Sequence, residues 1–270
     1  MGAGPQALLD EGFRHELERD GVEVQVTRVR PESAWGTELK TTLDLHHRVA
    51  AHVQGAVGVG SSPLVLAGDC SMTVGVVAGL GLDERVGVLW LDAHADFETP
   101  ETDPSGYLDG QGLAMLTGRC WSAHTASLPG FVPVPDVRVL LVGARDLGRA
   151  EASDLDASGV LRLAADATAE EVGRTVARWL ADVDRVHVHV DVDVLDASYG
   201  RANDWASPHG MCPDDVLRLV RLVAASRPVA SAVLASWDPA ADPDEALRPS
   251  VRRIALALAT ALAVAHADGR

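Results

Sequence analysis

The stretch LWLDAHADFETPE (89–101) joins a run of apolar residues to three ionisable side chains at alternate positions, Asp92, His94 and Asp96. Residues two apart in extended backbone point to the same side, so these three side chains converge if the extension persists. Burying them costs free energy unless something compensates for their lost hydration. A divalent metal ion would compensate. The stretch therefore predicts a metal site at the end of a buried strand.

A second apolar run ends in the same way. In VHVHVDVDVLD (186–196), Asp191 and Asp193 are again two residues apart. A third run is followed by AGDCS (67–71), where Cys70 is either a metal ligand or a small buried thiol, and both interpretations stay open. Oxygen-rich ligation with an imidazole suits Mn²⁺ or a similar metal, and the number of carboxylates allows two ions to be bridged.

The remaining chain alternates short β-branched runs with longer helical segments, which predicts an α/β fold with a parallel sheet covered on both faces. Ligand sites of such sheets lie beyond the carboxyl ends of the strands. No linker divides the chain, so we expect one domain over residues 1–270. We expect strands at 22–29, 63–68, 86–92, 137–143, 160–163, 186–191 and 231–236, and helices at 37–57, 71–80, 111–118, 146–157, 168–181, 213–225 and 244–266.

Composition narrows the class of partner. A formal net charge of −16 over 270 residues argues against binding nucleic acid or an anionic membrane through a basic surface. The apolar segment 254–267 is too short to span a bilayer, so no membrane partner is expected. Three cysteines make no paired framework, and the N-terminal residues do not resemble a signal peptide, so we expect a cytoplasmic protein.

These motifs resemble those of the ureohydrolase superfamily, which contains arginases, agmatinases and formimidoylglutamases. DAHAD (92–96) matches the pattern D-A-H-x-D, AGDCS (67–71) resembles G-G-D-H-S, and HVDVDVLDA (189–197) resembles S-F-D-x-D-x-x-D-P. DFETPETDPSGYLDGQ (96–111) and GARD (143–146) are similar to two further family blocks. The resemblance implies an arginase-like, three-layer α/β/α domain with an eight-stranded, mostly parallel sheet.

The resemblance also implies a dinuclear Mn²⁺ centre. Asp92 and Asp191 would bridge the ions. The remaining ligands would be Cys70 and Asp96 on one ion and His94 and Asp193 on the other. A metal-bridging hydroxide would attack a guanidinium or amidine carbon, and Asp96 would help to protonate the departing nitrogen. Members of the superfamily act on small molecules and are often homo-oligomers, either trimers or hexamers.

Several residues depart from the family pattern. Cys70 replaces a histidine, so Zn²⁺ is possible at that site. Asp109 replaces a proton-shuttling histidine and could relay protons, bind a cationic substrate, or only cap the following helix. Ser236 replaces a glutamate that contacts the guanidinium, which argues against an unmodified arginine-like substrate group unless Asp109 or Asp238 supplies the missing carboxylate. His189 stands at a usual serine position and could support the metal ligands.

Further candidates concern the substrate. Ser105 and Glu151 match arginase positions that bind the substrate's carboxylate and amino groups. Glu98 replaces an asparagine there and would repel a carboxylate, although Glu98 and Glu151 could equally be solvated surface residues. Trp205 and His209, in an unusual loop, could line the pocket, or Trp205 could anchor that loop to the core.

We therefore expect a dinuclear-metal hydrolase of a linear C–N bond in a guanidino, N-hydroxyguanidino or formimino compound. A non-catalytic relative that binds a metal or ligand is the alternative, since three usual functional residues are replaced. A Zn²⁺-dependent amide hydrolase is the third and weakest interpretation.

Overall fold

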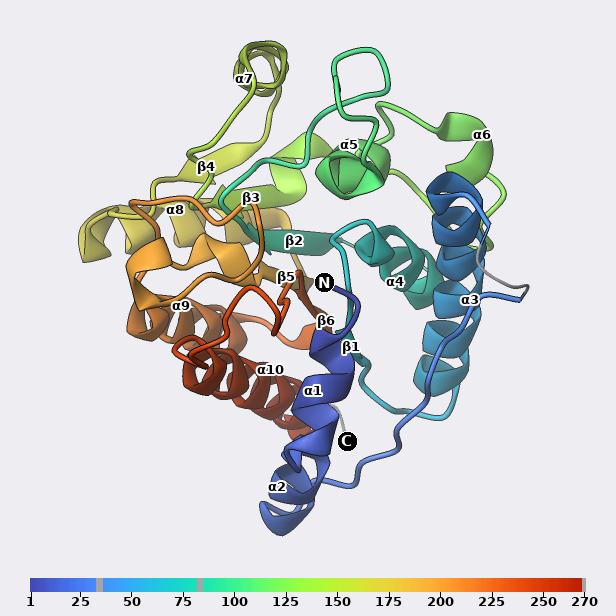
Figure 1. Ribbon diagram of the computed structural model, residues 1–270, viewed down its shortest axis with the longest axis vertical. Helices are drawn as coiled ribbons and strands as arrows, with labels where there is room; N and C mark the ends of the chain where they lie inside the picture. The colour runs from blue at the N-terminus through green and yellow to red at the C-terminus, as the bar shows by residue number, and fades with distance from the viewer. Residues whose placement is uncertain (33–35, 82–84, 269–270) are drawn as a thin grey trace.

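The computed structural model describes residues 1–32, 36–81 and 85–268, which form a parallel sheet between two layers of helices (Figure 1). All strand pairings in these residues are parallel. In spatial order the six strands are β1 (Leu64–Leu66), β6 (Val229–Ala235), β5 (Arg185–Asp191), β2 (Val86–Leu91), β3 (Val139–Val142) and β4 (Leu161–Leu163).

Side-chain alternation along the strands builds the two cores. In β2, Leu89 and Leu91 join the core under the helices α8 (Ala169–Trp179), α9 (Pro213–Ser226) and α10 (Arg248–Asp268). Val88 and Trp90 join the core under α3 (Glu38–Gly58) and α4 (Met72–Leu80). Both faces of the strand are thereby buried, as its continuous apolar sequence requires. The helices are α1 (Gly4–Asp10), α2 (Phe13–Arg19), α3 (Glu38–Gly58), α4 (Met72–Leu80), α5 (Gly112–Leu116), α6 (Ser122–Thr125), α7 (Arg149–Ala157), α8 (Ala169–Trp179), α9 (Pro213–Ser226) and α10 (Arg248–Asp268).

Local sequence accounts for several helix ends. The Thr168 hydroxyl accepts a hydrogen bond from the Glu171 amide while the Glu171 carboxylate accepts one from the Thr168 amide, a capping box that starts α8. Thr37 caps α3, and Pro213 occupies the first turn of α9, where its missing N–H costs nothing. The seven expected helices are all present, with ends shifted by a few residues.

One expected strand is not part of the sheet in the described residues, while the parallel sheet between helices is as expected. Residues 22–29 run as extended chain outside the sheet, although their sequence alternates like a strand. In the described part of the chain the sheet has six strands instead of eight. Alternation is a local signal, whereas a strand needs a neighbour with free backbone groups, and that condition depends on the tertiary fold.

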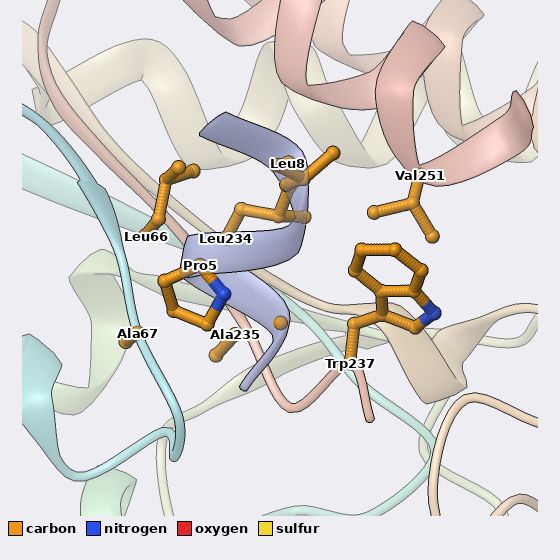
Figure 2. Close-up of a pocket in the computed structure, with 9 residues that line it drawn as sticks. Pro5, Leu8, Leu66, Ala67, Leu234, Ala235, Trp237 and Val251 are labelled. Atoms are coloured by element: carbon orange, nitrogen blue, oxygen red, sulfur yellow. The ribbon is translucent and has the colours of Figure 1, made fainter. Parts of the chain in front are cut away.

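The apolar pocket in Figure 2 is not the candidate site. It lies where α1 covers the ends of β1 and β6, and its lining includes Leu8, Leu66, Leu234, Trp237 and Val251. These side chains offer packing and no convergent ionisable groups. Among the residues that the structure describes, no helix combines the length and apolar character needed to cross a membrane.

Candidate metal centre

The carboxyl end of β2 brings Asp92 and His94 beside Asp193, which follows β5. His94 Nδ1 lies 3.4 Å from Asp92 Oδ1 and 3.4 Å from Asp193 Oδ2. Burial disfavours a charge on His94, but Asp193 and Asp92 outweigh burial and raise the pKa of the imidazole to about 12. Without a cation, a proton on His94 is therefore what holds the two carboxylates together. A divalent ion would replace that proton.

Cys70, in the loop after β1, faces the same centre. Its thiol donates to Asp191 Oδ2 at 2.9 Å and lies 3.4 Å from Ser236 Oγ, while its amide donates to Asp109 Oδ1 at 2.5 Å. Burial, and next the charge of Asp191, raise the pKa of the thiol well above its ordinary value. The sulfur is thus protonated in the metal-free protein, and a metal ion that binds it as a thiolate would release a proton.

Asp96 has the least satisfied carboxylate in the cluster. Its Oδ2 is buried and has no hydrogen-bond partner among the residues that the structure describes. Ligand atoms of Asp96, Cys70 and Asp109 all lie within 4.8 Å of one another. Burial, followed by the charge of Asp92, raises the pKa of Asp96 well above its usual range. A buried carboxylate oxygen without a partner, on a residue close to other potential ligand atoms, fits a metal site.

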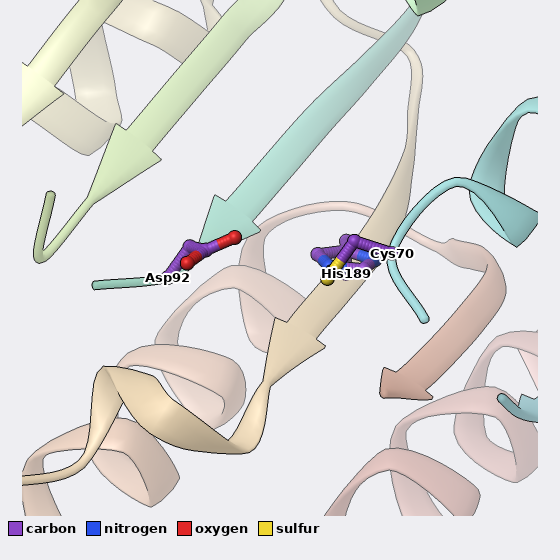
Figure 3. A group of neighbouring side chains, drawn as sticks. All are labelled: Cys70, Asp92 and His189. Atoms are coloured by element: carbon purple, nitrogen blue, oxygen red, sulfur yellow. The ribbon is translucent and has the colours of Figure 1, made fainter. Parts of the chain in front are cut away.

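His189 is a further member of the cluster (Figure 3). Its Nε2 lies 3.2 Å from Cys70 Sγ, and its Nδ1 lies 2.7 Å from Thr73 Oγ1. Its ring stacks on Trp90 at a centroid separation of 3.8 Å. Burial lowers the pKa of His189 well below its ordinary value, so the imidazole is neutral.

The residues present therefore fit a pair of divalent cations. Three groups of potential ligands overlap, because Cys70 belongs to two of them and Asp92 to two. They are Cys70–Asp92–His189, Cys70–Asp96–Asp109 and Asp92–His94–Asp193. Asp191 joins them through the Cys70 thiol, and its Oδ1 accepts the Asp193 amide at 2.7 Å. All six expected ligands, including Cys70, thus lie in one continuous cluster.

Asp109 does not cap the helix that follows it. No side chain caps the first turn of α5, whose N-cap is Gln111. The Asp109 carboxylate instead accepts the Cys70 amide and lies among the candidate ligands. Burial, followed by the charge of Asp69, raises the pKa of Asp109 well above its usual range. This position is compatible with proton relay and with contact to a cationic group.

Glu151 is not a solvated surface residue, and Glu98 is half-buried. Glu151 is buried, and its two carboxylate oxygens accept the Phe97 amide at 3.1 Å and the Gly148 amide at 3.2 Å. It thus ties α7 to the strand-end segment that carries the candidate ligands Asp92, His94 and Asp96. Glu98 Oε2 is buried and has no hydrogen-bond partner among the described residues. Its Oε1 would lie only 2.7 Å from a Cβ placed on Gly148, so a glycine there leaves room for this carboxylate.

The other expected substrate residues lie in loops around the centre. Ser105 is exposed, and its hydroxyl donates to Asp103 at 2.6 Å, so its own loop already engages it. Trp205 is half exposed and stacks on Tyr107 rather than entering the core, which contradicts the anchoring alternative. His209 is exposed, with a backbone φ of 64°.

Ser236 lies at the centre, whereas Asp238 is engaged elsewhere. Ser236 is fully buried beside Cys70. The Asp238 carboxylate pairs with the Met1 ammonium at 3.1 Å and accepts the Ala240 amide at 3.0 Å. Asp238 therefore does not replace the glutamate that the family pattern has at Ser236.

Two supporting residues were missed by sequence reasoning. Asn203 donates from Nδ2 to Asp193 Oδ2 at 3.2 Å and to the Ser236 carbonyl at 3.0 Å, and no spacing pattern signals this role. The Arg145 guanidinium of GARD donates to the carbonyls of Asp193 at 3.0 Å and Ser207 at 2.8 Å. It thus fastens the loop after β5 to the strand end, and only the family block signalled its position.

Comparison with known proteins agrees with this geometry. A model of the Arginase family matches residues 2–265. The chain belongs to the arginase family. Arginase from Bacillus caldovelox is 33% identical over 215 residues, which are 72% of this chain and 71% of that protein. The solved arginase of Bacillus subtilis matches with a TM-score of 0.85 and 25% identity, covering 95% of this chain and 91% of that one.

A formimidoylglutamase of Bacillus subtilis shares the fold, with a TM-score of 0.65 and 19% identity over 88% of this chain and 69% of that one. Arginase-family members are hydrolases that bind a dinuclear metal, usually Mn²⁺. The candidate clusters of this chain lie where its arginase-like fold gathers the strand ends.

Proposed function

We propose that this arginase-family chain is a metal-dependent hydrolase of a linear C–N bond in a guanidino, N-hydroxyguanidino or formimino compound. The observation that carries the proposal is the buried cluster of carboxylates with His94 and Cys70, in which Asp96 Oδ2 has no described partner. So many buried acidic groups are too costly for a purely structural role, but they suit divalent cations.

The ligands of two cations divide as follows. His94 and Asp193 would hold one cation, Asp96 and Cys70 would hold the other, and Asp92 and Asp191 would contribute further ligands. Bound divalent ions would supply Lewis acidity, which lowers the pKa of a water molecule toward neutrality. Asp96 would hold a proton and donate it to the departing nitrogen.

The residues around the centre favour a weakly basic reacting group. The buried Ser236 supplies a hydroxyl where the family pattern has a carboxylate, so a guanidinium would lack that counter-charge. Glu151 is committed to two backbone amides, and the Glu98 carboxylate would repel an α-carboxylate. These contacts favour an N-hydroxyguanidine or formimino nitrogen over an arginine-like group. Trp205 and His209 would line the entrance.

A substrate panel tests the proposal. The protein is loaded with Mn²⁺ or Zn²⁺ and supplied with arginine, agmatine, N-hydroxyarginine and formimidoylglutamate. We expect metal-dependent release of urea, hydroxyurea or formamide, and no release by Asp96→Ala with any metal. No release by a wild type that holds two metals would contradict the proposal. Release of acetate from acyl-amines would instead revive the amide-hydrolase alternative.

The non-catalytic alternative makes a different prediction about metal content. If Cys70 has weakened one site beyond use, wild type holds at most one ion per chain after purification with Mn²⁺. Cys70→His would then restore two ions. A cytoplasmic location and a trimeric or hexameric assembly stay predictions, which fractionation and solution mass measurement would check.

A further inference from the structure

His189 on β5 lies beside Cys70, at a position where the family pattern has no metal ligand. We infer that His189 Nε2 binds the cation on the Cys70 side of the metal centre, and this inference rests on the proposed function. The site then has a thiolate, an imidazole and carboxylates, which together favour Zn²⁺ over Mn²⁺.

Position in the strand is the first support. His189 precedes Asp191 by two residues on β5, so the two side chains lie on the same face of the sheet. Ligand atoms of His189, Cys70 and Asp92 all lie within 4.8 Å of one another, and all three residues are buried. Figure 3 shows the Cys70 sulfur beside the imidazole ring of His189, with Asp92 beyond the end of the adjacent β2.

The ring is also held in an orientation that suits a ligand. Thr73 Oγ1, 2.7 Å from Nδ1, can accept the Nδ1–H, which leaves the lone pair of Nε2 directed at the Cys70 side. Trp90 is the register partner of His189 across the sheet and stacks on it with an interplanar angle of 22°. The same indole donates from Nε1 to Asp92 Oδ2 at 3.0 Å. One tryptophan thus fixes two of the three ligands.

Two departures from the family pattern meet here. Cys70 stands where G-G-D-H-S has its histidine, and His189 stands where S-F-D-x-D has its serine. They are far apart in sequence, but Cys70 Sγ and His189 Nε2 lie 3.2 Å apart. An imidazole lost from the loop after β1 is therefore replaced by one from β5, which β6 separates from β1 in the sheet. The centre keeps two imidazoles, His94 and His189, and gains a sulfur.

The competing role for His189 is that of a positioning residue. Its Nε2–H would then donate to a Cys70 thiolate, with Thr73 as the donor to Nδ1, and the imidazole would touch no metal. The heavy-atom distances are compatible with either proton arrangement. A test must therefore count nitrogen ligands rather than measure affinity or activity alone.

The experiment compares His189→Ser with His187→Ser. His187 is the matched control because it is a buried histidine of the same strand, bonded to Ser231 at 2.7 Å. Chelator-stripped proteins are titrated with Zn²⁺ alone, and X-ray absorption counts imidazole ligands around the bound ion. We expect His189→Ser to lose one imidazole and more than about 100-fold in Zn²⁺ affinity, beyond what loss of an orienting partner causes. We expect His187→Ser to match wild type.

Further variants keep the test decisive. His189→Gln retains bulk against Trp90 if the serine variant fails to fold, and it should also lose one imidazole. Cys70→His with His189→Ser should move the metal preference toward Mn²⁺ by roughly tenfold or more. An unchanged imidazole count in the folded His189 variants would overturn the inference, even if affinity falls.

The outcomes separate the two proposals. A wild type that binds no divalent cation overturns both the proposed function and the role of His189. Metal-dependent hydrolysis with an unchanged imidazole count in His189→Ser overturns only the role of His189. A His189-dependent Zn²⁺ site without hydrolysis of any amidine supports the role of His189 and overturns the proposed function.

Discussion

Replacing Asp96 by asparagine should stabilise the metal-free protein and destabilise the metal-loaded one. Asp96 Oδ2 is buried without a described partner, and leaving such a group unsatisfied costs about 1–3 kcal/mol. Asparagine keeps the shape and removes the charge. Since Asp96 has a φ of 50°, a left-handed conformation that asparagine also tolerates, the backbone adds little to the comparison. We expect Asp96→Asn to raise the free energy of unfolding by about 1–3 kcal/mol at pH 7 in the presence of a chelator.

The pH dependence has a definite sign. Burial, followed by the charge of Asp92, raises the pKa of Asp96 in the folded state, so the folded protein holds this proton more tightly than the unfolded chain. The contribution of Asp96 to stability is therefore greatest below the unfolded pKa of about 3.9 and is lost as the pH rises. The advantage of Asp96→Asn should grow between pH 4 and pH 7.

When metal is bound, wild type should be more stable than Asp96→Asn. At a free metal concentration one hundred times the dissociation constant, a bound ion stabilises the wild type by about 2.7 kcal/mol. The variant lacks a carboxylate ligand, so metal should raise its free energy of unfolding by less. Urea unfolding with chelator and with Mn²⁺ measures both effects, and Asp166→Asn at an exposed site is the charge-matched control. A variant that is less stable than wild type in chelator, or that gains equally from metal, would refute the reasoning.

Three other substitutions test separate parts of the structure. Glu151→Ala should lower the free energy of unfolding by about 1–3 kcal/mol, because the Phe97 and Gly148 amides lose their acceptor, and an unchanged midpoint in urea would contradict this. Burial lowers the pKa of His46 to about 3, so its contribution to stability is present above pH 6.5 and lost as the pH falls. Between pH 6.5 and pH 4.5 in chelator, the free energy of unfolding of wild type should therefore fall by about 2–3 kcal/mol more than that of His46→Gln. Equal losses in the two proteins would contradict this role of His46. Trp205→Ala should change the free energy of unfolding by less than about 1 kcal/mol, because the indole is half exposed. It should raise the KM for the best substrate of the panel. An unchanged KM would show that Trp205 does not line the pocket.

The candidate ligands at each strand end were predictable because the signal is local. The apolar run before Asp92 predicts a buried strand. The alternate positions of Asp92 and His94 predict that both side chains point to the same side of its end. The same holds for Asp191 and Asp193 after β5. Parallel strands place their carboxyl ends at one edge, so the meeting of the two pairs also followed from the sequence.

The segment 22–29 shows where local reasoning ends. Its alternation is as regular as that of a strand, yet it runs outside the sheet. Glu151 is a second example, since its charge predicted either substrate contact or a solvated surface. The fold instead buries it between the Phe97 and Gly148 amides. Pairing and burial both depend on segments distant in sequence, which no local pattern specifies.

By itself, the sequence determined that Asp92 and His94, and likewise Asp191 and Asp193, each point to one side of a strand end as candidate ligands, because side-chain alternation within a strand is a property of the backbone. Only the tertiary structure decided that His189 faces Cys70. The register that sets His189 beside Trp90, and the course of the loop after β1 that brings Cys70 to His189, join residues about a hundred positions apart or more. Such contacts follow from how the strands of the whole sheet pair, and they decide which candidate ligand atoms lie together.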